Sequence, residues 1–440
     1  LIVTSLTQTA DAMELLVITF LETQLPCVWP AATNLYLLTL SMFSGMLVGA
    51  VLGGVVADKY GRRTAYGLMT SAIGLFGLLS AFAQSVWVLC VCRFMVGVGL
   101  ASPAALSLFA EFLPAAKRGS RLLSFFCFFS VGAVVEALVA WACIVNFPPD
   151  VGWRVMLVVS SLPAVLLFFV VPFGVLPESP RFLVVRGERE AAQAVLASVA
   201  RVNGTTLPAG TLTVARRGVS PPPITSGRGS PTLAVADVDA RASVVDLWAQ
   251  VALRQRLVVL CVLYLLMAVV YYALVLLTNV VVVQSRHGGA CAMDNTDFLA
   301  SVVINAAELP GLFVSALLVD VIGRRATVAS MFVVCGCAAV ALAAAPPWAA
   351  VRIGVLFVAR ASALGFNQSL WVLTCEAFPT AVRTSAVGLA TSFARIGGAL
   401  APTICYFYAL HQQLGMLLTG VLCAIAATLV RVSIPEDTAG

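Results

Sequence analysis

The sequence DKYGRR, from Asp58 to Arg63, packs four charged residues into six positions. A nearly identical stretch, DVIGRR, runs from Asp320 to Arg325. Such a density of charge is unusual here, because only 10% of the 440 residues are charged and 61% are hydrophobic. The same charged turn in two distant parts of the chain indicates a duplicated architecture.

The apolar composition predicts an integral membrane protein. The mean hydropathy is +1.01, and the hydrophobic content exceeds the roughly 45–50% of soluble domains. A membrane-spanning helix needs about 20 apolar residues. We therefore predict an all-α membrane protein with twelve transmembrane helices, at 1–21, 35–57, 65–84, 87–108, 122–144, 154–176, 257–280, 298–319, 326–345, 351–373, 386–409 and 413–432. The chain begins at Leu1 rather than Met, and we expect a segment to precede it.

Basic residues in the loops predict the orientation of these spans. One side carries ten of them, which are Lys59, Arg62, Arg63, Lys117, Arg118, Arg121, Arg324, Arg325, Arg383 and Arg431. The opposite side carries Arg154, Arg286 and Arg352. Because basic loops stay in the cytosol, we predict that both GRR turns and both termini are cytosolic, in a plasma or vesicular membrane.

Other charged residues recur in the same order in the two parts of the chain. Asp58, Arg93, Glu111 and Arg118 have counterparts 262 to 267 positions later, in Asp320, Arg360, Glu376 and Arg383. This near-constant offset indicates that a six-helix unit was duplicated in parallel orientation. We predict an N-terminal six-helix bundle (1–176), a cytosolic linker (177–256), a C-terminal six-helix bundle (257–434) and a cytosolic tail (435–440).

The linker has a different character from the spans. Residues 187–202 show helical periodicity with one apolar face, which predicts an amphipathic helix. Residues 213–232 are rich in Pro, Gly and Ser, and we expect them to be disordered. A second short helix is expected at 242–256, leading into the seventh span.

The repeated charges predict a gate on the cytosolic side. An arginine can bind a carboxylate with two parallel hydrogen bonds, and a glycine allows the tight turn that brings such groups together. We expect these ion pairs to hold the cytosolic side closed and to break when the cavity opens inward. A solvated turn of a basic loop is the alternative. The gate residues are Asp58, Gly61, Arg62, Arg63, Glu111, Arg118, Asp320, Gly323, Arg324, Arg325, Glu376 and Arg383.

Ionisable residues inside spans are costly and are candidates for function. Asp11 and Glu14 lie three positions apart in the first span and so share a helix face. Arg93 lies inside the fourth span. A static ion pair, or direct binding of an organic cation by the two carboxylates, would also explain these residues. Glu136 could line a cavity or be structural, and Arg395 could belong to the lower gate or reach the interface.

Aromatic and amide side chains near the middle of the spans are candidates for substrate binding. We predict that this site contains Tyr271, Tyr272, Asn279, Asn305, Glu308, Asn367 and Trp371. The indole of Trp371 offers a flat apolar face and one hydrogen-bond donor, which suits an aromatic group, a sugar ring or a cation. Anchoring at the membrane interface is the alternative for this residue.

Several classes of site are not indicated by the sequence. A phosphate-binding P-loop motif is absent, so ATP is not expected as the energy source. The twelve cysteines and two histidines do not form a motif with metal-ligand spacing, and we expect neither a metal nor another cofactor. A disulfide between Cys27 and Cys291 is one option. The basic residues form short loop clusters, which does not favour a nucleic-acid partner.

Five stretches resemble the sugar-porter branch of the major facilitator superfamily. They are DKYGRR, DVIGRR, EFLPAAKRG (Glu111 to Gly119), PESPRFL (Pro177 to Leu183) and PEDTAG (Pro435 to Gly440). Within this branch, TADAMELL (Thr9 to Leu16), CEAFPTAVR (Cys375 to Arg383), YYALVLLT (Tyr271 to Thr278) and AELPGLFV (Ala307 to Val314) resemble synaptic vesicle two-related proteins and organic-ion transporters. The resemblance implies two six-helix bundles that work by alternating access. It also implies that a carboxylate of the first span pairs with Arg93 and releases it on protonation. Asp11 fits that role by position, and Glu14 is the alternate.

The chain departs from this family in three places. PEDTAG stands where sugar porters have PETKG, and the seventh span lacks the Gln-Gln pair with which sugar porters hold hexose. The long outer loop of the synaptic vesicle two proteins between spans seven and eight is also absent. These departures weaken the case for hexose as the substrate.

We therefore expect a proton-coupled secondary transporter of a small organic ion or polar metabolite, and not an enzyme. A sugar transporter, facilitative or proton-coupled, is one alternative. A transport-silent membrane receptor or scaffold is the other. The expected partners are a small-molecule substrate, protons and the lipid bilayer, and we expect a monomer.

Overall fold

Helices account for most of the residues that the computed structural model describes. These are residues 2–29, 35–100, 104–113, 118–170, 176–207, 212–215, 233–237, 250–284, 293–345, 348–378 and 380–433. The first half contains α1 (Ile2–Val28), α2 (Tyr36–Tyr60), α3 (Arg62–Ser80), α4 (Val86–Leu100), α5 (Ala104–Glu111), α6 (Arg118–Asn146) and α7 (Pro149–Val170). The second half contains α11 (Val251–Gln284), α12 (Asn295–Ala306), α13 (Glu308–Ile322), α14 (Arg324–Ala344), α15 (Ala349–Ala377), α16 (Thr380–Leu410) and α17 (Gln412–Ser433).

The twelve predicted spans coincide with these helices, and the predicted fold class is confirmed. Ten spans are single helices, while the fourth corresponds to α4 with α5 and the eighth to α12 with α13. In the described part of the chain, eight segments are long and apolar enough to cross a membrane. The eighth span is divided at Ala307 because Pro310, which has no N–H, cannot donate to the Ala306 carbonyl.

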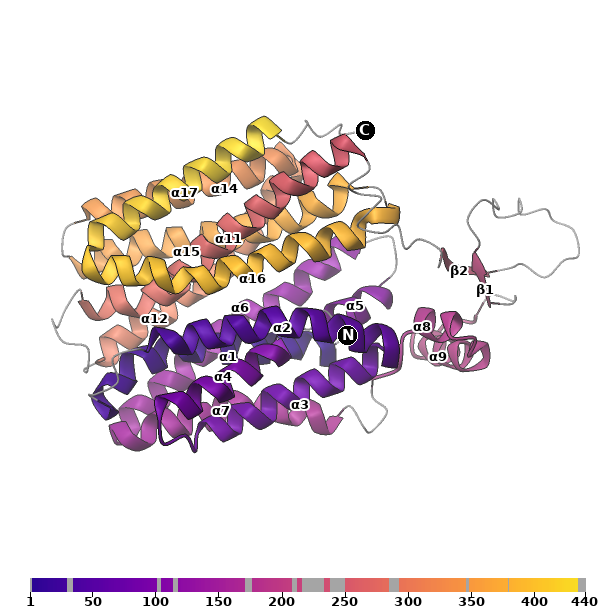
Figure 1. The fold of residues 1–440 in the computed structure, drawn as a ribbon, viewed down its shortest axis with the longest axis horizontal. Coiled ribbons are helices and arrows are strands. Elements are labelled where there is room, and N and C mark those ends of the chain that lie inside the picture. The colour runs from indigo at the N-terminus through magenta and orange to yellow at the C-terminus, as the bar shows by residue number, and fades with distance from the viewer. Residues whose placement is uncertain are drawn as a thin grey trace, which may run out of the picture.

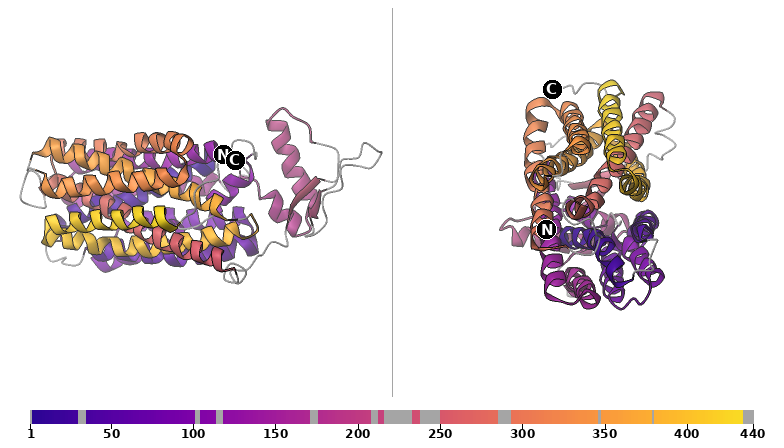
Figure 2. Two further views of the ribbon diagram at one scale, coloured as in Figure 1. Left: turned by 90° about the horizontal axis from the view of Figure 1, so that it is seen from above. Right: turned by 90° about the vertical axis from the view of Figure 1, so that its left-hand side faces the viewer.

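The two halves lie side by side with their helices running in similar directions (Figure 1). The indigo-to-magenta half and the orange-to-yellow half form two separate groups in the end-on view of Figure 2. The start of α1 and the end of α17 lie at the same end of the bundle, and the linker helices and strands project beyond it (Figures 1 and 2). We call this end the terminal end and the opposite one the distal end.

Glycines bring the second and fourth spans of each half into backbone contact. A Cβ atom on Gly45 of α2 would overlap the Phe94 carbonyl oxygen of α4, and one on Gly97 would overlap the Met42 carbonyl oxygen. In the second half, a Cβ atom on Gly311 of α13 would overlap the Ala361 carbonyl oxygen of α15. Small residues at such crossings let membrane helices approach closely. The same contact therefore recurs in both halves, as a duplicated unit requires.

The linker is more structured than its sequence predicted. It contains the short helix α8 (Pro180–Val185) and the amphipathic helix α9 (Arg189–Val202), which agrees with the helix predicted at 187–202. Leu183, Val184 and Ala192 form a small core between α8 and α9. Strands β1 (Leu212–Ala215) and β2 (Leu233–Asp237) pair in parallel, although disorder was predicted from residue 213. Both strands are short and mostly apolar, LTVA and LAVAD, and a search for helical periodicity does not detect such runs.

Candidate functional site

The GRR turn of the first half is held by two glutamates. Gly61 has a φ of +99°, a conformation that glycine adopts far more readily than other residues. At the start of α3, Arg62 binds Glu111 at the end of α5, with 2.7 Å between Nη1 and Oε1. Glu178 accepts hydrogen bonds from the N–H groups of Arg62 (2.9 Å) and Arg63 (3.1 Å). A carboxylate is favourable there because the N-terminus of a helix carries a partial positive charge.

The second half repeats the ion pair of this turn. Gly323 has a φ of +83°. Arg324 forms an ion pair with Glu376, in which Nη2 donates to Oε1 at 3.2 Å and Nε lies 2.8 Å from Oε2. Arg324 and Glu376 are 34% and 50% exposed, so water screens this pair. Both ion pairs connect helices of the same half.

The remaining predicted gate residues lie near these two ion pairs but are not members of them. Asp58 and Asp320 are exposed near the C-terminal ends of α2 and α13. Arg63 and Arg325 occupy the second positions of α3 and α14. The side chains of Arg118 and Arg383 lie outside the described part of the chain. Glu178 was not predicted as a site residue, although it belongs to the PESPRFL stretch.

A buried ion pair lies inside the first half. Arg93 donates from Nη1 to Glu14 Oε2 at 2.8 Å, and both side chains are 0% exposed. Its Nε and Nη2 groups donate to the Ser80 hydroxyl at 3.2 and 2.6 Å. The sequence favoured Asp11 over Glu14 as the partner of Arg93, but the structure pairs Arg93 with Glu14. Asp11 instead lines a cavity and accepts a hydrogen bond from Gln8 at 3.2 Å.

A matching ion pair lies inside the second half. Arg360 binds Glu308 with 2.8 Å between Nη2 and Oε1, and both side chains are again 0% exposed. Arg360 also donates to Asn305 at 2.9 Å, and the Tyr271 hydroxyl donates to Glu308 at 2.9 Å. Arg360, the counterpart of Arg93, thus also binds a buried carboxylate. Duplication relates the first span, which holds Glu14, to the seventh span, but Glu308 comes from the eighth.

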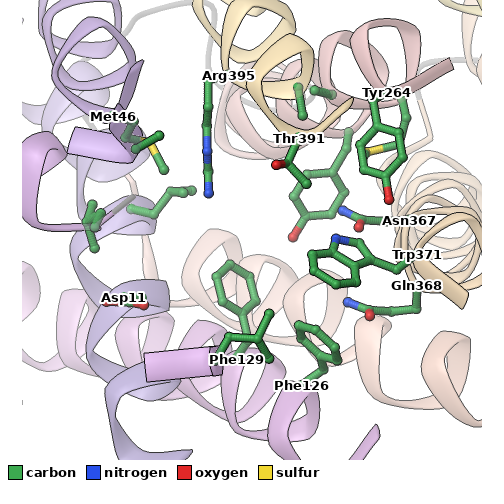
Figure 3. A pocket seen from close by; sticks show the side chains of 18 of the residues that line it. Asp11, Met46, Phe126, Phe129, Tyr264, Asn367, Gln368, Trp371, Thr391 and Arg395 are labelled. Carbon is green, nitrogen blue, oxygen red and sulfur yellow. The ribbon is translucent and has the colours of Figure 1, made fainter. Parts of the chain in front are cut away.

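A cavity of about 340 Å³ lies between the two halves (Figure 3). Among the predicted substrate-binding residues, Tyr271, Tyr272, Asn367 and Trp371 line it. Gln368, which clusters with Asn367 and Trp371 in the sequence, lines it as well. Further lining residues, which the sequence did not single out, are Gln8, Met46, Phe126, Phe129 and Thr391. No local pattern separates these side chains from others in the same helices. The wall includes Gln368 and Trp371 from the last third of α15 and Gly388 from the first third of α16, so the cavity extends toward the terminal end.

Opposite charges from the two halves face this cavity. Asp11 of α1 and Arg395 of α16 both line it, and Figure 3 shows the side chain of Arg395 extending into the open space. The Tyr272 hydroxyl lies within hydrogen-bonding reach of Arg395. On the other wall, the rings of Phe126 and Trp371 pack against each other across the two halves, with centroids 6.3 Å apart. The cavity therefore combines one carboxylate, one guanidinium and a group of aromatic faces.

Three predicted substrate-binding residues lie outside the cavity wall. Asn305 and Glu308 are used by the ion pair of Arg360, which satisfies their polar atoms away from the cavity. Asn279 lies at the distal end, where it donates to Thr19 of the first half at 3.0 Å and accepts from Ser301 at 2.9 Å. These positions correct the prediction, because each polar group already has a protein partner.

The two halves are in close contact at the distal end. In addition to the bond between Asn279 and Thr19, the rings of Phe20 and Phe298 stack with centroids 6.3 Å apart. The indole of Trp141 donates to Asn295 at 2.9 Å. The cavity is therefore shut off by these contacts on the distal side. Cys291 lies outside the described residues, so its disulfide with Cys27 stays a prediction.

Comparisons with known proteins agree with this architecture. The family described as "Sugar (and other) transporter" matches residues 5–438. The chain is 31% identical to organic cation/carnitine transporter 7 of Arabidopsis thaliana, over 98% of this chain and 89% of that protein. It is 32% identical to a synaptic vesicle 2-related protein of Xenopus laevis, over 99% of this chain and 78% of that protein. A niacin transporter of Acinetobacter baylyi is 27% identical, over 98% and 92%.

Solved structures show the same fold. The xylose transporter of E. coli, in a partially occluded inward-open conformation, superposes with a TM-score of 0.75. The alignment covers 100% of this chain and 98% of that one, at 17% sequence identity. At this level of identity, the likeness concerns the fold alone.

Proposed function

Because the chain belongs to the sugar (and other) transporter family of the major facilitator superfamily, we propose that it is a secondary transporter of a small organic ion. The protein is an integral membrane protein, and the family comprises transporters rather than enzymes. The substrate would bind in the cavity between the two halves. Rotation of the halves against each other would expose that cavity to one side of the membrane at a time.

The observation that carries this proposal is the pair of opposite charges in the cavity. Asp11 belongs to the first half and Arg395 to the second. A ligand that contacts both groups also connects both halves, so its affinity depends on how the halves are arranged. A ligand with such a difference in affinity shifts the balance between conformations. The charged wall therefore supports both recognition of an ion and its coupling to movement.

The remaining wall supports an organic rather than an inorganic ion. The volume of about 340 Å³ lies at the lower end of the range of small-molecule sites, which is about 300–1,000 Å³. Tyr271, Phe126 and Trp371 offer flat apolar faces for the body of such a molecule. The names of the Arabidopsis and Acinetobacter relatives, an organic cation/carnitine transporter and a niacin transporter, are consistent with this class.

Proton coupling would act through the buried pair of Glu14 and Arg93. Both side chains are 0% exposed, so protonation of Glu14 would break this ion pair. A buried charge that loses its partner is strongly destabilising. Such a change would favour another arrangement of α1 and α4, which carry the two residues. Proton binding would in this way be linked to the arrangement of the first half.

The terminal end would be the cytosolic side, according to the basic residues of its loops. On that orientation the cavity extends toward the cytosol, and the contacts around Asn279 close the outer side. Arg62 with Glu111 and Arg324 with Glu376 are paired in this arrangement, so their pairing alone does not close the inner side. We place the role of these pairs in holding the short turns of each half in shape.

A sugar remains the second candidate. Amide groups of Gln8, Asn367 and Gln368 line the cavity together with the hydroxyl groups of Thr391 and Ser392. Amides both donate and accept hydrogen bonds, which suits a polyol. A sugar would use these groups and would not need the charges of Asp11 and Arg395.

The two candidates can be separated by ligand binding and uptake. Thermal-shift measurements would compare organic cations, organic anions, zwitterions and hexoses at two pH values, since a bound ligand raises the apparent stability. Uptake of the best ligand into proteoliposomes would then be compared for wild type, Asp11→Asn and Arg395→Gln, with Asp150→Asn as the matched control. Asp150 is exposed in the first turn of α7 and lies outside the cavity.

We expect Asp11→Asn or Arg395→Gln to abolish uptake and Asp150→Asn to leave it unchanged. Hexose uptake that survives both cavity variants would favour the sugar carrier instead. Binding without any accumulation in the vesicles would contradict transport.

A further inference from the structure

The buried ion pairs of the two halves differ in their charge balance. In the second half, one carboxylate meets one guanidinium. Glu308 Oε1 accepts from Arg360 and Tyr271, and the Ser130 hydroxyl lies 3.5 Å from Oε2. Both oxygens of Glu308 therefore have a neighbouring donor, and the negative and positive charges cancel.

The buried cluster of the first half contains two carboxylates for one guanidinium. Besides Glu14, it contains Glu136 of α6, which is also 0% exposed. Glu136 lies close enough to Glu14 and Arg93 for electrostatic interaction with both. Arg93 is the guanidinium of this cluster, and its donors are directed to Glu14 and Ser80. A single positive charge cannot balance two ionised carboxylates.

The hydrogen bonds of Glu136 point to the same imbalance. Its Oε2 accepts from the Ser160 hydroxyl at 2.7 Å. Its Oε1, like Glu14 Oε1, has no hydrogen-bond partner in the part of the chain that the structure describes. A buried ionised carboxylate without a partner is costly, whereas a protonated one is neutral and has a donor of its own.

Among the described residues that face Glu136, none is a second cation that could balance the extra negative charge. Glu14 faces it from α1, Arg93 from α4 and Ser160 from α7, and Cys143 is its neighbour on α6. On the side of α6 toward the second half, Ser130 meets Glu308 and Trp141 meets Asn295.

We propose that Glu136 is a second proton-binding group, and that Glu14 and Glu136 share one proton beside Arg93. In the arrangement seen here, the proton is on Glu136 and Arg93 pairs with Glu14. When the O–H bond of Glu136 breaks and one forms on Glu14, the negative charge moves to Glu136 and Arg93 changes partner. The net charge of the cluster stays the same, while the ion pair moves from α1 to α6.

This proposal concerns the bound proton and can be tested without a transported substrate. It deepens the proton coupling proposed above, yet its readout does not depend on transport. The purified chain in lipid nanodiscs would be examined by infrared difference spectroscopy in H2O and D2O, where the carbonyl stretch of a protonated carboxyl separates from carboxylate bands. The variants are Glu136→Gln, Glu14→Gln and, as the matched control from the balanced pair, Glu308→Gln.

We expect one protonated-carboxyl band of the wild type to be lost in Glu136→Gln. The same band should be lost in Glu14→Gln, because Glu136 then becomes the ionised partner of Arg93. It should persist in Glu308→Gln. A band that survives in Glu136→Gln, or that is lost in Glu136→Gln but kept in Glu14→Gln, would overturn the shared proton.

A cation is the other species that could balance the charge. Addition of Na⁺ at constant pH should leave the band unchanged if the site holds a proton. Loss of the band on addition of Na⁺ would instead show that the extra carboxylate belongs to a cation site, and would also overturn the proposal. Uptake that fails while the band behaves as expected would contradict the proposed transport function and leave the shared proton intact.

Discussion

Replacement of Glu308 by glutamine should destabilise the protein more than the same change at Glu14. Without Glu308, the guanidinium of Arg360 is left in a site where it is 0% exposed. Removal of one partner of a buried ion pair costs about 3–5 kcal/mol. Without Glu14, Arg93 keeps Ser80 and lies beside Glu136, which can replace the lost charge. The loss is then closer to that of one charge-assisted hydrogen bond, at about 1.5–3 kcal/mol, and is offset by the new pair.

These free energies translate into different melting temperatures. An unfolding entropy of about 2.1 cal/mol/K per residue gives about 0.9 kcal/mol per degree for a chain of 440 residues. Glu308→Gln should therefore lower the apparent melting temperature by about 3–5 °C, and Glu14→Gln by about 1–2 °C. The assay is thermal unfolding in nanodiscs at neutral pH, followed by tryptophan fluorescence.

A double variant provides the control. Glu308→Gln combined with Arg360→Met removes both charges, so no unpaired charge stays buried, and most of the lost stability should return. Two results would refute the reasoning. One is a loss at Glu14 that equals or exceeds the loss at Glu308, and the other is a double variant that melts no higher than Glu308→Gln alone.

Two further predictions concern the distal contacts and the GRR turn. Asn279→Ala removes the hydrogen bond to Thr19, which joins the two halves and is worth about 1 kcal/mol, and should raise the distally open population about 5-fold. A membrane-impermeant thiol reagent should then label a cysteine introduced at Ser301 faster, and an unchanged labelling rate would argue against a closing role for Asn279. Gly61→Ala should cost about 1–2 kcal/mol, because alanine disfavours a φ of +99° and its Cβ would overlap the Glu178 carboxylate. Gly54→Ala is the control, since its Cβ would meet nothing within 4 Å, and equal melting temperatures for the two variants would contradict the strain at Gly61.

The sequence predicted the fold well because its signals are local. Each span is a continuous apolar run, and the repeated GRR turns mark the duplication. The amphipathic helix α9 was likewise found from the spacing of its apolar residues. The strands β1 and β2 were missed because each has at most five residues and depends on a partner about 20 positions away.

The site was only partly predictable, because it depends on contacts between distant residues. Arg93 clearly required a carboxylate, but Asp11 and Glu14 are one helical turn apart, and hydropathy does not distinguish them. Asn305 and Glu308 were expected to face the substrate. Their partner Arg360 lies more than 50 positions away in the sequence, so only packing shows that their polar groups are already used. Arg395 could be recognised as a charge inside a span, but not as the counterpart of Asp11 across the cavity.

The glycine crossings have a consequence for how this protein can move. Since α2 touches α4 and α13 touches α15 backbone to backbone, neither pair can slide or separate without breaking close contacts. Densely packed units of this kind respond to force by turning as rigid bodies rather than by bending. The difference in energy between conformations is then set at the seam between the halves, by a small number of polar and aromatic contacts. Substitutions in the cavity wall can therefore change which ligand is preferred. The rigid-body movement of the two halves would stay the same.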